Sequence, residues 1–159
     1  MKKYILDLKV VSNEMLGDKH VLIKLTSDGQ LPATRPGQFV EVRVDHSPTT
    51  FLRRPISIHY VDEEKNELWL LIQLVGDGTR QLAEVKKGEI VNVVMPLGNG
   101  FTEPSAEEKC LLLVGGGVGI APLLQLGKEL KAKGIVPNFL LGGRSAKDLI
   151  QLEEYKKIG

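Results

Sequence analysis

The clearest chemical signal in the sequence is a glycine turn, Gly115-Gly116-Gly117-Val118-Gly119. A continuous apolar run at residues 110–114 precedes it, and residues 120–133 follow with apolar side chains at helical spacing. Glycines let the backbone approach a phosphate closely, and the N-terminus of a following helix favours negative charge. The turn therefore predicts phosphate binding, although Ile120 and Ala121 depart from the spacing G-x-G-x-x-G. A tight strand-to-helix connection without a ligand is the alternative.

Two further segments carry residue types that bind phosphates. In Arg53-Arg54-Pro55-Ile56-Ser57, an arginine at a strand start could pair its planar guanidinium with a pyrophosphate, and the serine can hydrogen-bond. In Gly76-Asp77-Gly78-Thr79, glycines precede a short helix for which Thr79 is a candidate N-cap. The alternatives are a strand start with two solvated arginines and a turn that only caps a helix.

The elements that would position these motifs begin with β structure over the first hundred residues. Residues 39–44 alternate, with Val40, Val42 and Val44 on one face, which is the period of a half-buried strand. Similar short runs, separated by turn signals, lie at residues 4–11, 20–26, 56–60, 67–75 and 89–95. We expect an antiparallel barrel or sandwich, interrupted at residues 76–85 by a turn and a short helix.

The pattern changes after a polar stretch at residues 102–109, which has the composition of a linker. The run at 110–114 predicts a strand buried on both faces, as in a parallel sheet. Further elements are predicted as a helix at 120–133, a strand at 136–141, and a helix at 145–157 with Ser145 as N-cap and Asp148 three residues later. This order begins a doubly wound nucleotide-binding domain.

Composition narrows the classes of partner. Lys+Arg is 21 and Asp+Glu is 20, so a net charge of +1 gives no reason to expect nucleic acid or an anionic membrane surface. No apolar run is long enough to span a bilayer, and the N-terminus lacks the pattern of a signal peptide. The single cysteine, Cys110, allows neither an internal disulfide nor a cysteine-only metal site. We therefore expect a cytoplasmic protein.

Several residues whose side chains could bind a metal or take part in catalysis are expected to be structural. His20, His46 and His59 have no metal-ligand spacing and are predicted to be ordinary surface or strand residues. Trp69 and Cys110 are predicted to be core residues. We find no catalytic triad and no acid–base pair, so no catalytic residue and no metal ligand is predicted. That pattern suits an electron carrier in which a bound cofactor does the chemistry.

The motifs occur together in an order that resembles the ferredoxin–NADP reductase superfamily. The matching segments are Arg54-Pro55-Ile56-Ser57 with the flavin motif R-x-Y-S, Pro36-Gly37-Gln38-Phe39 with the turn P-G-Q-F, residues 114–122 with the nicotinamide-domain glycine motif, and Gly142-Gly143-Arg144-Ser145 with the stretch after it. The resemblance covers essentially the whole chain. It implies an FAD-binding antiparallel β-barrel of Greek-key type at residues 1–103 and part of an α/β NAD-binding domain at residues 104–159.

Three segments, FLRRPISI, GDGTRQL and PLGNGF, are similar to a narrower group, the electron-transfer subunits of the two-subunit, NAD-dependent dihydroorotate dehydrogenase B. That resemblance implies that electrons pass through FAD between a catalytic dehydrogenase subunit and NAD, in pyrimidine biosynthesis. It implies that Arg54 contacts the FAD phosphates and that Ser57 lies near the reactive edge of the flavin. The other implied cofactor-binding residues are Pro55 and Ile56 of the same motif, Leu71, Ile72 and Gln73 along the ring or ribityl chain, Gly78 and Thr79 at the pyrophosphate, and Gly115, Gly116, Gly117 and Gly119 at the NAD pyrophosphate.

The chain departs from the family at two points. The tyrosine of R-x-Y-S is Ile56 here, so aromatic stacking at that point is absent. Members of the narrower group carry four cysteines near the C-terminus for a [2Fe–2S] cluster, whereas this chain ends at Gly159 with only Cys110. We therefore expect a C-terminally truncated fragment that lacks the cluster and the rest of the NAD domain. Hydride transfer with NAD by the fragment is expected to be weak or absent.

Two alternative functions remain open from the sequence. The first is a flavin subunit of a hydrogenase or of a ferredoxin–NADP transhydrogenase, which are relatives within the same superfamily. The second is a non-catalytic nucleotide-binding module that has lost its flavin, which Ile56 makes conceivable. Arg144 could favour the 2′-phosphate of NADP over NAD, and a backbone-packing role is its alternative.

Overall fold

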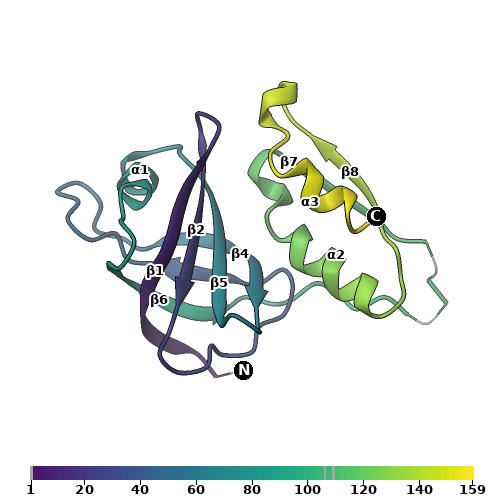
Figure 1. The fold of residues 1–159 in the computed structure, drawn as a ribbon, viewed down its shortest axis with the longest axis horizontal. Helices are drawn as coiled ribbons and strands as arrows, with labels where there is room; N and C mark the ends of the chain where they lie inside the picture. The colour runs from purple at the N-terminus through teal and green to yellow at the C-terminus, as the bar shows by residue number, and fades with distance from the viewer. Residues whose placement is uncertain (1, 106, 109) are drawn as a thin grey trace.

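The first hundred residues form a closed β-barrel in the computed structural model, which describes residues 2–105, 107–108 and 110–159 (Figure 1). Its strands are β1 (Tyr4–Leu16), β2 (His20–Thr26), β3 (Phe39–Val42), β4 (Arg54–Asp62), β5 (Glu67–Gln73) and β6 (Ile90–Leu97). They close in the order β1-β2-β5-β4-β3-β6, and every neighbouring pair is antiparallel. The predicted antiparallel barrel is therefore confirmed.

Alternation along the strands decides which side chains fill the barrel. Val40, Val42 and Val44 are 0%, 1% and 8% exposed, so the face predicted from residues 39–44 is the buried one, although β3 itself ends at Val42. The core is closed at one end by Leu82 of the short helix α1 (Asp77–Ala83), which lies within the predicted segment 76–85. A barrel filled with side chains leaves no room for a ligand inside, so any ligand must bind outside it.

The second part, the α/β unit at residues 110–159, contains two parallel strands, β7 (Leu112–Gly116) and β8 (Asn138–Gly142). Its helical segments are the 3₁₀ turn η1 (Gly117–Ile120), the helix α2 (Leu123–Ala132), the 3₁₀ turn η2 (Ala146–Asp148) and the helix α3 (Leu152–Lys156). Figure 1 shows this unit to the right of the barrel, and α2 packs against β4. Among the described residues, no helix is long and apolar enough to cross a membrane.

A second hydrophobic cluster joins the two parts. It combines Leu71 of β5 with Ile120, Ala121, Leu124 and Tyr155 of the α/β unit, all of them almost fully buried. Leu71 can reach this cluster because it points away from the barrel interior, whereas its neighbours Leu70 and Ile72 point into the barrel core. The outer surface of β4 and β5 is therefore a packing surface for the α/β unit.

The strand predicted at 110–114 differs from the observed one in position and burial. β7 runs from Leu112 to Gly116, and Leu112, Val114 and Leu140 are 60%, 62% and 59% exposed. The prediction of a strand buried on both faces is wrong because the helices of this unit cover only one face of the two-stranded sheet. Cys110, predicted as a core residue, is exposed and precedes the strand.

The helix predicted at 145–157 is interrupted. Ser145 does begin a turn in which its backbone N–H donates to the Asp148 carboxylate at 2.9 Å, as the predicted capping residues require. The chain then passes through Gln151 in the left-handed region, at φ 56°, before α3 begins. Helical periodicity cannot reveal such a break, because the apolar spacing continues across it.

Trp69 is also placed differently from the prediction. It lies on the outside of the barrel, half-buried, with its ring edge-to-face on Tyr60 at a centroid distance of 5.3 Å. The ammonium groups of Lys24 and Lys128 lie 3.8 Å from the Trp69 and Tyr60 rings, respectively. Alternation predicts this position, since Trp69 shares the outer face of β5 with Leu71 and Gln73.

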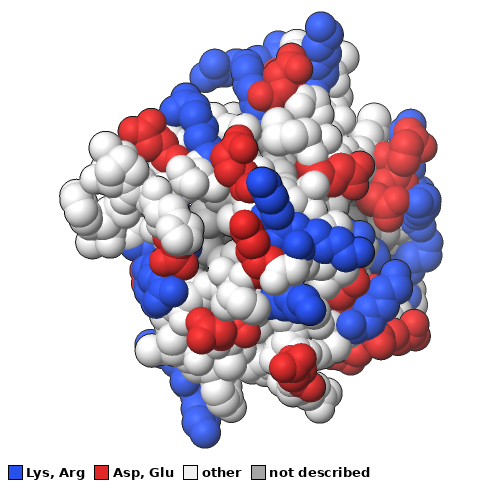
Figure 2. All heavy atoms as spheres, turned by 60° about the vertical axis from the view of Figure 1, so that its left-hand side comes forward, with Lys and Arg blue, Asp and Glu red and all other residues white. Residues whose placement is uncertain are grey.

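Charged side chains of both signs are spread over the surface. Figure 2 shows acidic and basic residues interspersed over the face that it draws. Most ion pairs among the described residues are local, such as Arg43 with Asp45 at 2.7 Å and Lys156 with Glu153 at 2.7 Å. Exposed pairs of this kind contribute little to stability.

Candidate functional site

A cavity of about 200 Å³ lies between the outer surface of the barrel and the glycine turn. We call it the interface cavity, and it is lined by Pro55, Ile56, Ser57, Leu71, Ile72, Gln73, Val75, Thr79, Val118 and Ala121. Seven of the residues predicted from the sequence as cofactor-binding, taken from three separate segments, therefore lie around one space. Closure of the barrel brings them together, because β4 and β5 are antiparallel neighbours.

The wall formed by β4 and β5 is polar at two points and apolar elsewhere. Ser57 and Gln73 are half-buried on the outer face, so their side chains can hydrogen-bond to a ligand in the interface cavity. Ile56 and Ile72 are 9% and 1% exposed and belong to the barrel core. The substitution of Ile56 for the family tyrosine is therefore accommodated as a core side chain.

The two adjacent arginines have different environments. Arg53 is committed to the barrel: its terminal nitrogens donate to the Glu41 carbonyl at 3.3 Å and to the carbonyl and side-chain oxygen of Asn92. Arg54 uses only its Nε within the described residues, donating to the Arg53 carbonyl at 3.0 Å. The terminal guanidinium nitrogens of Arg54 therefore remain free to bind an anion.

The turn before α1 approaches Arg54 closely. A Cβ atom built on Gly78 would lie 3.0 Å from Arg54 Cδ and 3.0 Å from Thr50 Cγ2, so only a glycine fits there without displacing them. The helix begins at Asp77 with Gly76 as N-cap, so the prediction of Thr79 as the cap is wrong. Thr79 instead accepts hydrogen bonds from the backbone N–H groups of Val75 and Gly76 at 3.0 and 3.1 Å. Its hydroxyl holds the turn in place.

The family resemblance implies that this turn holds the pyrophosphate of FAD, and on that expectation Gly78→Ala should weaken FAD binding about tenfold, which corresponds to about 1.4 kcal/mol. The added methyl group would push against Arg54 and Thr50 and move the guanidinium from its position beside the turn. Gly29→Ala is the matched control, because a Cβ there meets nothing within 4 Å. Titration of each variant with FAD, followed by fluorescence, measures the effect. An unchanged dissociation constant for Gly78→Ala would show that this close approach does not matter for binding.

The glycines of the glycine turn occupy their positions for different structural reasons. A Cβ on Gly115 would lie 2.8 Å from Leu123 Cδ1 and 3.1 Å from Ile120 Cα, so this glycine permits close strand-to-helix packing. Gly117 has φ +53°, a conformation that glycine adopts without steric cost. Gly116 and Gly119 have no atom closer than 3.9 Å to an added Cβ, so their backbone is open to a ligand. A phosphate role is therefore sterically open to Gly116, Gly117 and Gly119, whereas Gly115 is explained by packing.

Comparisons with known proteins find relatives that are named as electron-transfer subunits. No protein-family model matches the chain. The chain is 38% identical over 154 residues to the "Dihydroorotate dehydrogenase B (NAD(+)), electron transfer subunit" of Bacillus pumilus (strain SAFR-032), covering 96% of the chain and 59% of that protein. It is 48% identical over 120 residues to the protein of the same name from Bacillus mycoides (strain KBAB4), covering 75% of the chain and 46% of that protein.

A solved structure extends the likeness to the fold. The chain superposes on an NADH-dependent reduced ferredoxin–NADP oxidoreductase with a TM-score of 0.80 at 31% identity, over 95% of this chain and 53% of the other. The predicted resemblance to the ferredoxin–NADP reductase superfamily is confirmed. The chain is thus similar to proteins that are named as electron-transfer subunits, and it spans about half the length of the relatives it matches.

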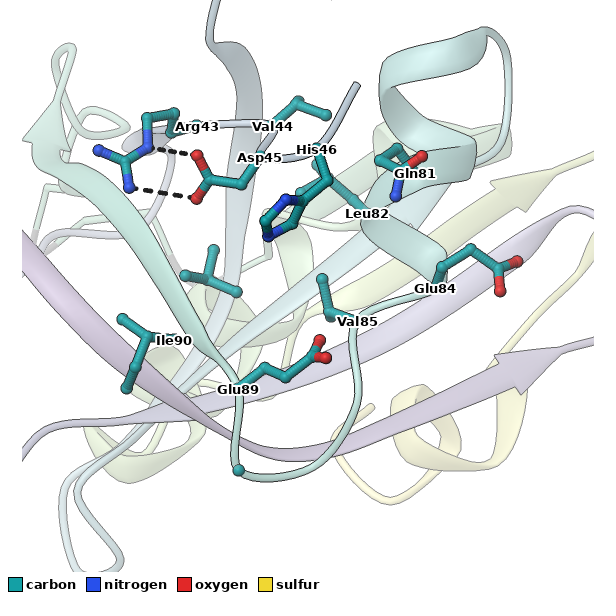
Figure 3. Close-up of a pocket in the computed structure, with 12 residues that line it drawn as sticks. Arg43, Val44, Asp45, His46, Gln81, Leu82, Glu84, Val85, Glu89 and Ile90 are labelled. Carbon is teal, nitrogen blue, oxygen red and sulfur yellow. Dashed lines mark hydrogen bonds and ion pairs between the residues drawn. The ribbon is translucent and has the colours of Figure 1, made fainter. Parts of the chain in front are cut away.

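A larger cavity lies elsewhere on the barrel, and none of the residues predicted to bind a cofactor line it. It has a volume of about 360 Å³ and lies between the segment 43–46, the C-terminal half of α1 and residues 84–91 (Figure 3). Its cation, Arg43, is already paired with Asp45 through two hydrogen bonds of 2.7 and 3.2 Å. Within the superfamily fold, the smaller interface cavity is the one that combines the flavin and nucleotide motifs.

Sequence reasoning missed three residues that line the interface cavity, Val75, Val118 and Ala121. It also missed His59, which is fully buried and contacts the Ala121 carbonyl. A usable signal existed for His59, because Ser57 and His59 are two residues apart on one strand and must share a face. In the described residues, no three His, Cys, Asp or Glu side chains are grouped so as to hold a metal ion.

Proposed function

We propose that this chain is the FAD-binding part of an electron-transfer subunit, in which electrons pass through FAD between a partner dehydrogenase and NAD. The observation that carries the proposal is Arg54, whose side chain packs closely against the turn at Gly78, whose terminal guanidinium nitrogens are free among the described residues, and whose neighbours Pro55 to Ser57 line the interface cavity. A fixed planar cation next to a glycine turn suits a pyrophosphate, and an adjoining partly apolar cavity suits an aromatic ring system. Bound FAD would supply the one- and two-electron chemistry that amino-acid side chains lack.

The residues of this chain would bind and orient the cofactor. Arg54, with the turn at Gly78 and Thr79, would hold the pyrophosphate, while Ser57 and Gln73 would hydrogen-bond to polar atoms of the flavin. Leu71 and Val118 would exclude water from its ring, because both line the interface cavity. On the other side of the cavity, the open backbone at Gly116, Gly117 and Gly119 would receive the pyrophosphate of NAD. In this proposal residues 1–103 bind FAD and residues 104–159 supply part of the NAD site.

The wider role is proposed from the names of the relatives. Both curated relatives are electron transfer subunits of dihydroorotate dehydrogenase B, which supports a catalytic dehydrogenase subunit as partner and a place in pyrimidine biosynthesis. The solved relative belongs to an NADH-dependent ferredoxin–NADP oxidoreductase, so a transhydrogenase-type partner is the second candidate. A [2Fe–2S] cluster outside these 159 residues and a cytoplasmic location stay predictions.

The absorption spectrum of the purified chain, before and after incubation with FAD and desalting, tests the proposal. We expect oxidised-flavin bands that remain with the protein at about one FAD per chain. FMN is the matched control ligand, because it lacks the second phosphate and the adenosine; we expect it to be retained less well than FAD. A folded protein that stays colourless with both flavins would contradict the proposal and favour a nucleotide-binding module without flavin.

A further inference from the structure

His59 lies at the junction of the barrel and the α/β unit. It is on β4 two residues after Ser57, and its side chain is on the same outer face of the barrel. It is 0% exposed, although it is a polar residue on the outside of a barrel. The α/β unit that packs on this face covers it.

Both ring nitrogens of His59 contact the α/β unit. Nδ1 lies 2.7 Å from the Ala121 carbonyl oxygen, and Nε2 lies 2.6 Å from the side-chain amide oxygen of Gln151. The preceding carbonyl, that of Ile120, accepts a hydrogen bond of 2.8 Å from the Tyr155 hydroxyl. Two consecutive carbonyls at the end of η1 are thus each bound by a buried side chain.

The protonation state of the ring follows from these partners. A carbonyl oxygen can only accept, so Nδ1 carries a proton. Burial lowers the pKa of His59, and the positive charge of Lys128 acts in the same direction. The hydrogen bonds to Ala121 and Gln151 and the negative charge of Glu154 partly oppose this lowering of the pKa. Gln151 can accept through its oxygen or, after a 180° turn of the amide, donate to Nε2 of a neutral ring. Nδ1–H therefore serves as the fixed donor in either state.

The carbonyl that His59 holds belongs to a residue of the interface cavity. Val118 and Ala121, at either end of one turn, form the wall of this cavity that faces β4 and β5. The Ala121 N–H donates to the Val118 carbonyl at 2.9 Å, so the two residues move together. The 2.7 Å contact between His59 and Ala121 is the directional contact between this wall and β4, beside the apolar packing of Ala121 with Leu71.

We propose that His59 is a positioning residue for the flavin site, whose Nδ1–H holds the glycine turn at a fixed distance from the outer face of the barrel. This inference rests on the proposed flavin-binding function of the interface cavity. An apolar side chain of similar size would fill the same space without the desolvation cost of burying an imidazole. A directional hydrogen bond adds a defined separation and register between the two packed parts.

Three variants of the full 159-residue chain separate position from packing. His59→Asn keeps an N–H near the place of Nδ1, His59→Gln carries its N–H near the place of Nε2, and His59→Phe keeps only the volume. The variant Leu130→Val is the matched control for lowered stability, because Leu130 is buried in α2 and does not line the interface cavity. For each we would measure the dissociation constant of FAD, quenching of bound-flavin fluorescence by iodide, and the melting temperature.

We expect His59→Phe and His59→Gln to weaken FAD binding by about 3- to 10-fold, the range set by one net hydrogen bond, and to increase iodide quenching. His59→Asn should stay within about twofold of the wild type in both measurements. Leu130→Val should lower the melting temperature and leave iodide quenching unchanged. If His59→Phe binds FAD and resists iodide like the wild type, or if Asn and Gln are equivalent, the inference is overturned while the proposed function stands. A wild-type chain that binds no FAD would contradict the proposed function, and this inference with it.

Discussion

Replacing Arg54 by alanine is expected to weaken FAD binding by about 10- to 100-fold and to leave the fold intact. Its terminal guanidinium nitrogens have no hydrogen-bond partner among the described residues, so the variant loses only the local hydrogen bond from Nε to the carbonyl of the preceding residue, Arg53. Charge-assisted hydrogen bonds to a phosphate contribute about 1.5–3 kcal/mol, which gives the expected range. Fluorescence titration with FAD measures the binding, and circular dichroism measures the fold.

Two further variants define the role of Arg54. Arg54→Lys keeps the charge but loses the planar fork, so its affinity for FAD should fall between those of the wild type and the alanine variant. Arg43→Ala is the matched control, because Arg43 is an exposed arginine of the same barrel that is paired with Asp45 and does not line the interface cavity. Equal affinities for wild type and Arg54→Ala would remove the main support for the pyrophosphate site.

Replacing the neighbouring Arg53 by methionine is expected to lower the free energy of unfolding by about 2–4 kcal/mol. Arg53 hydrogen-bonds to the Glu41 carbonyl and to Asn92, and the Asn92 side chain in turn donates to Asp7 at 2.6 Å. This chain of contacts ties the start of β4 to β3, β6 and β1. The variant would leave the side-chain oxygen of the buried Asn92 without its Arg53 donor, whereas the Asn92 carbonyl would keep the Arg43 N–H.

Denaturant unfolding of the flavin-free chain measures this loss of stability. Arg43→Met is again the control and should leave the unfolding midpoint unchanged, since its ion pair is exposed. The folded fraction of Arg53→Met should still bind FAD with an affinity close to that of the wild type. A variant that unfolds like the wild type but fails to bind FAD would reverse the roles given to the two arginines.

The contrast between Arg53 and Arg54 shows where the sequence stops being informative. The motif R-P-I-S and its place at a strand start are visible in the sequence, and the structure confirms the strand. Which guanidinium is free depends on Asn92, a residue 38 or 39 positions away that only barrel closure brings near. Local patterns carry information on periodicity, whereas this pairing is set by strand order.

In the α/β unit, too, the sequence pattern alone did not predict burial or helix continuity correctly. The apolar run 110–114 has the composition of a strand buried on both faces, yet Val114 is largely exposed because packing neighbours are present on one side only. The break at Gln151 is invisible to helical periodicity and places an amide against His59. His59 itself was predicted to be ordinary because no metal-ligand spacing accompanies it. The positioning role proposed for it depends on a contact with Ala121, which is 62 residues away.

A filled barrel obliges its ligand to sit on the outer surface, where the second hydrophobic cluster also forms. The interface cavity is therefore bounded by both parts of the molecule, with β4 and β5 on one side and Val118 and Ala121 on the other. A ligand that contacts both walls adds its binding free energy to that of docking, so occupancy and closure are thermodynamically linked. A substitution that weakens docking of the α/β unit, for example at Tyr155, should therefore also lower the affinity for the ligand. By the same reciprocity, a bound ligand should strengthen the docking of the two parts.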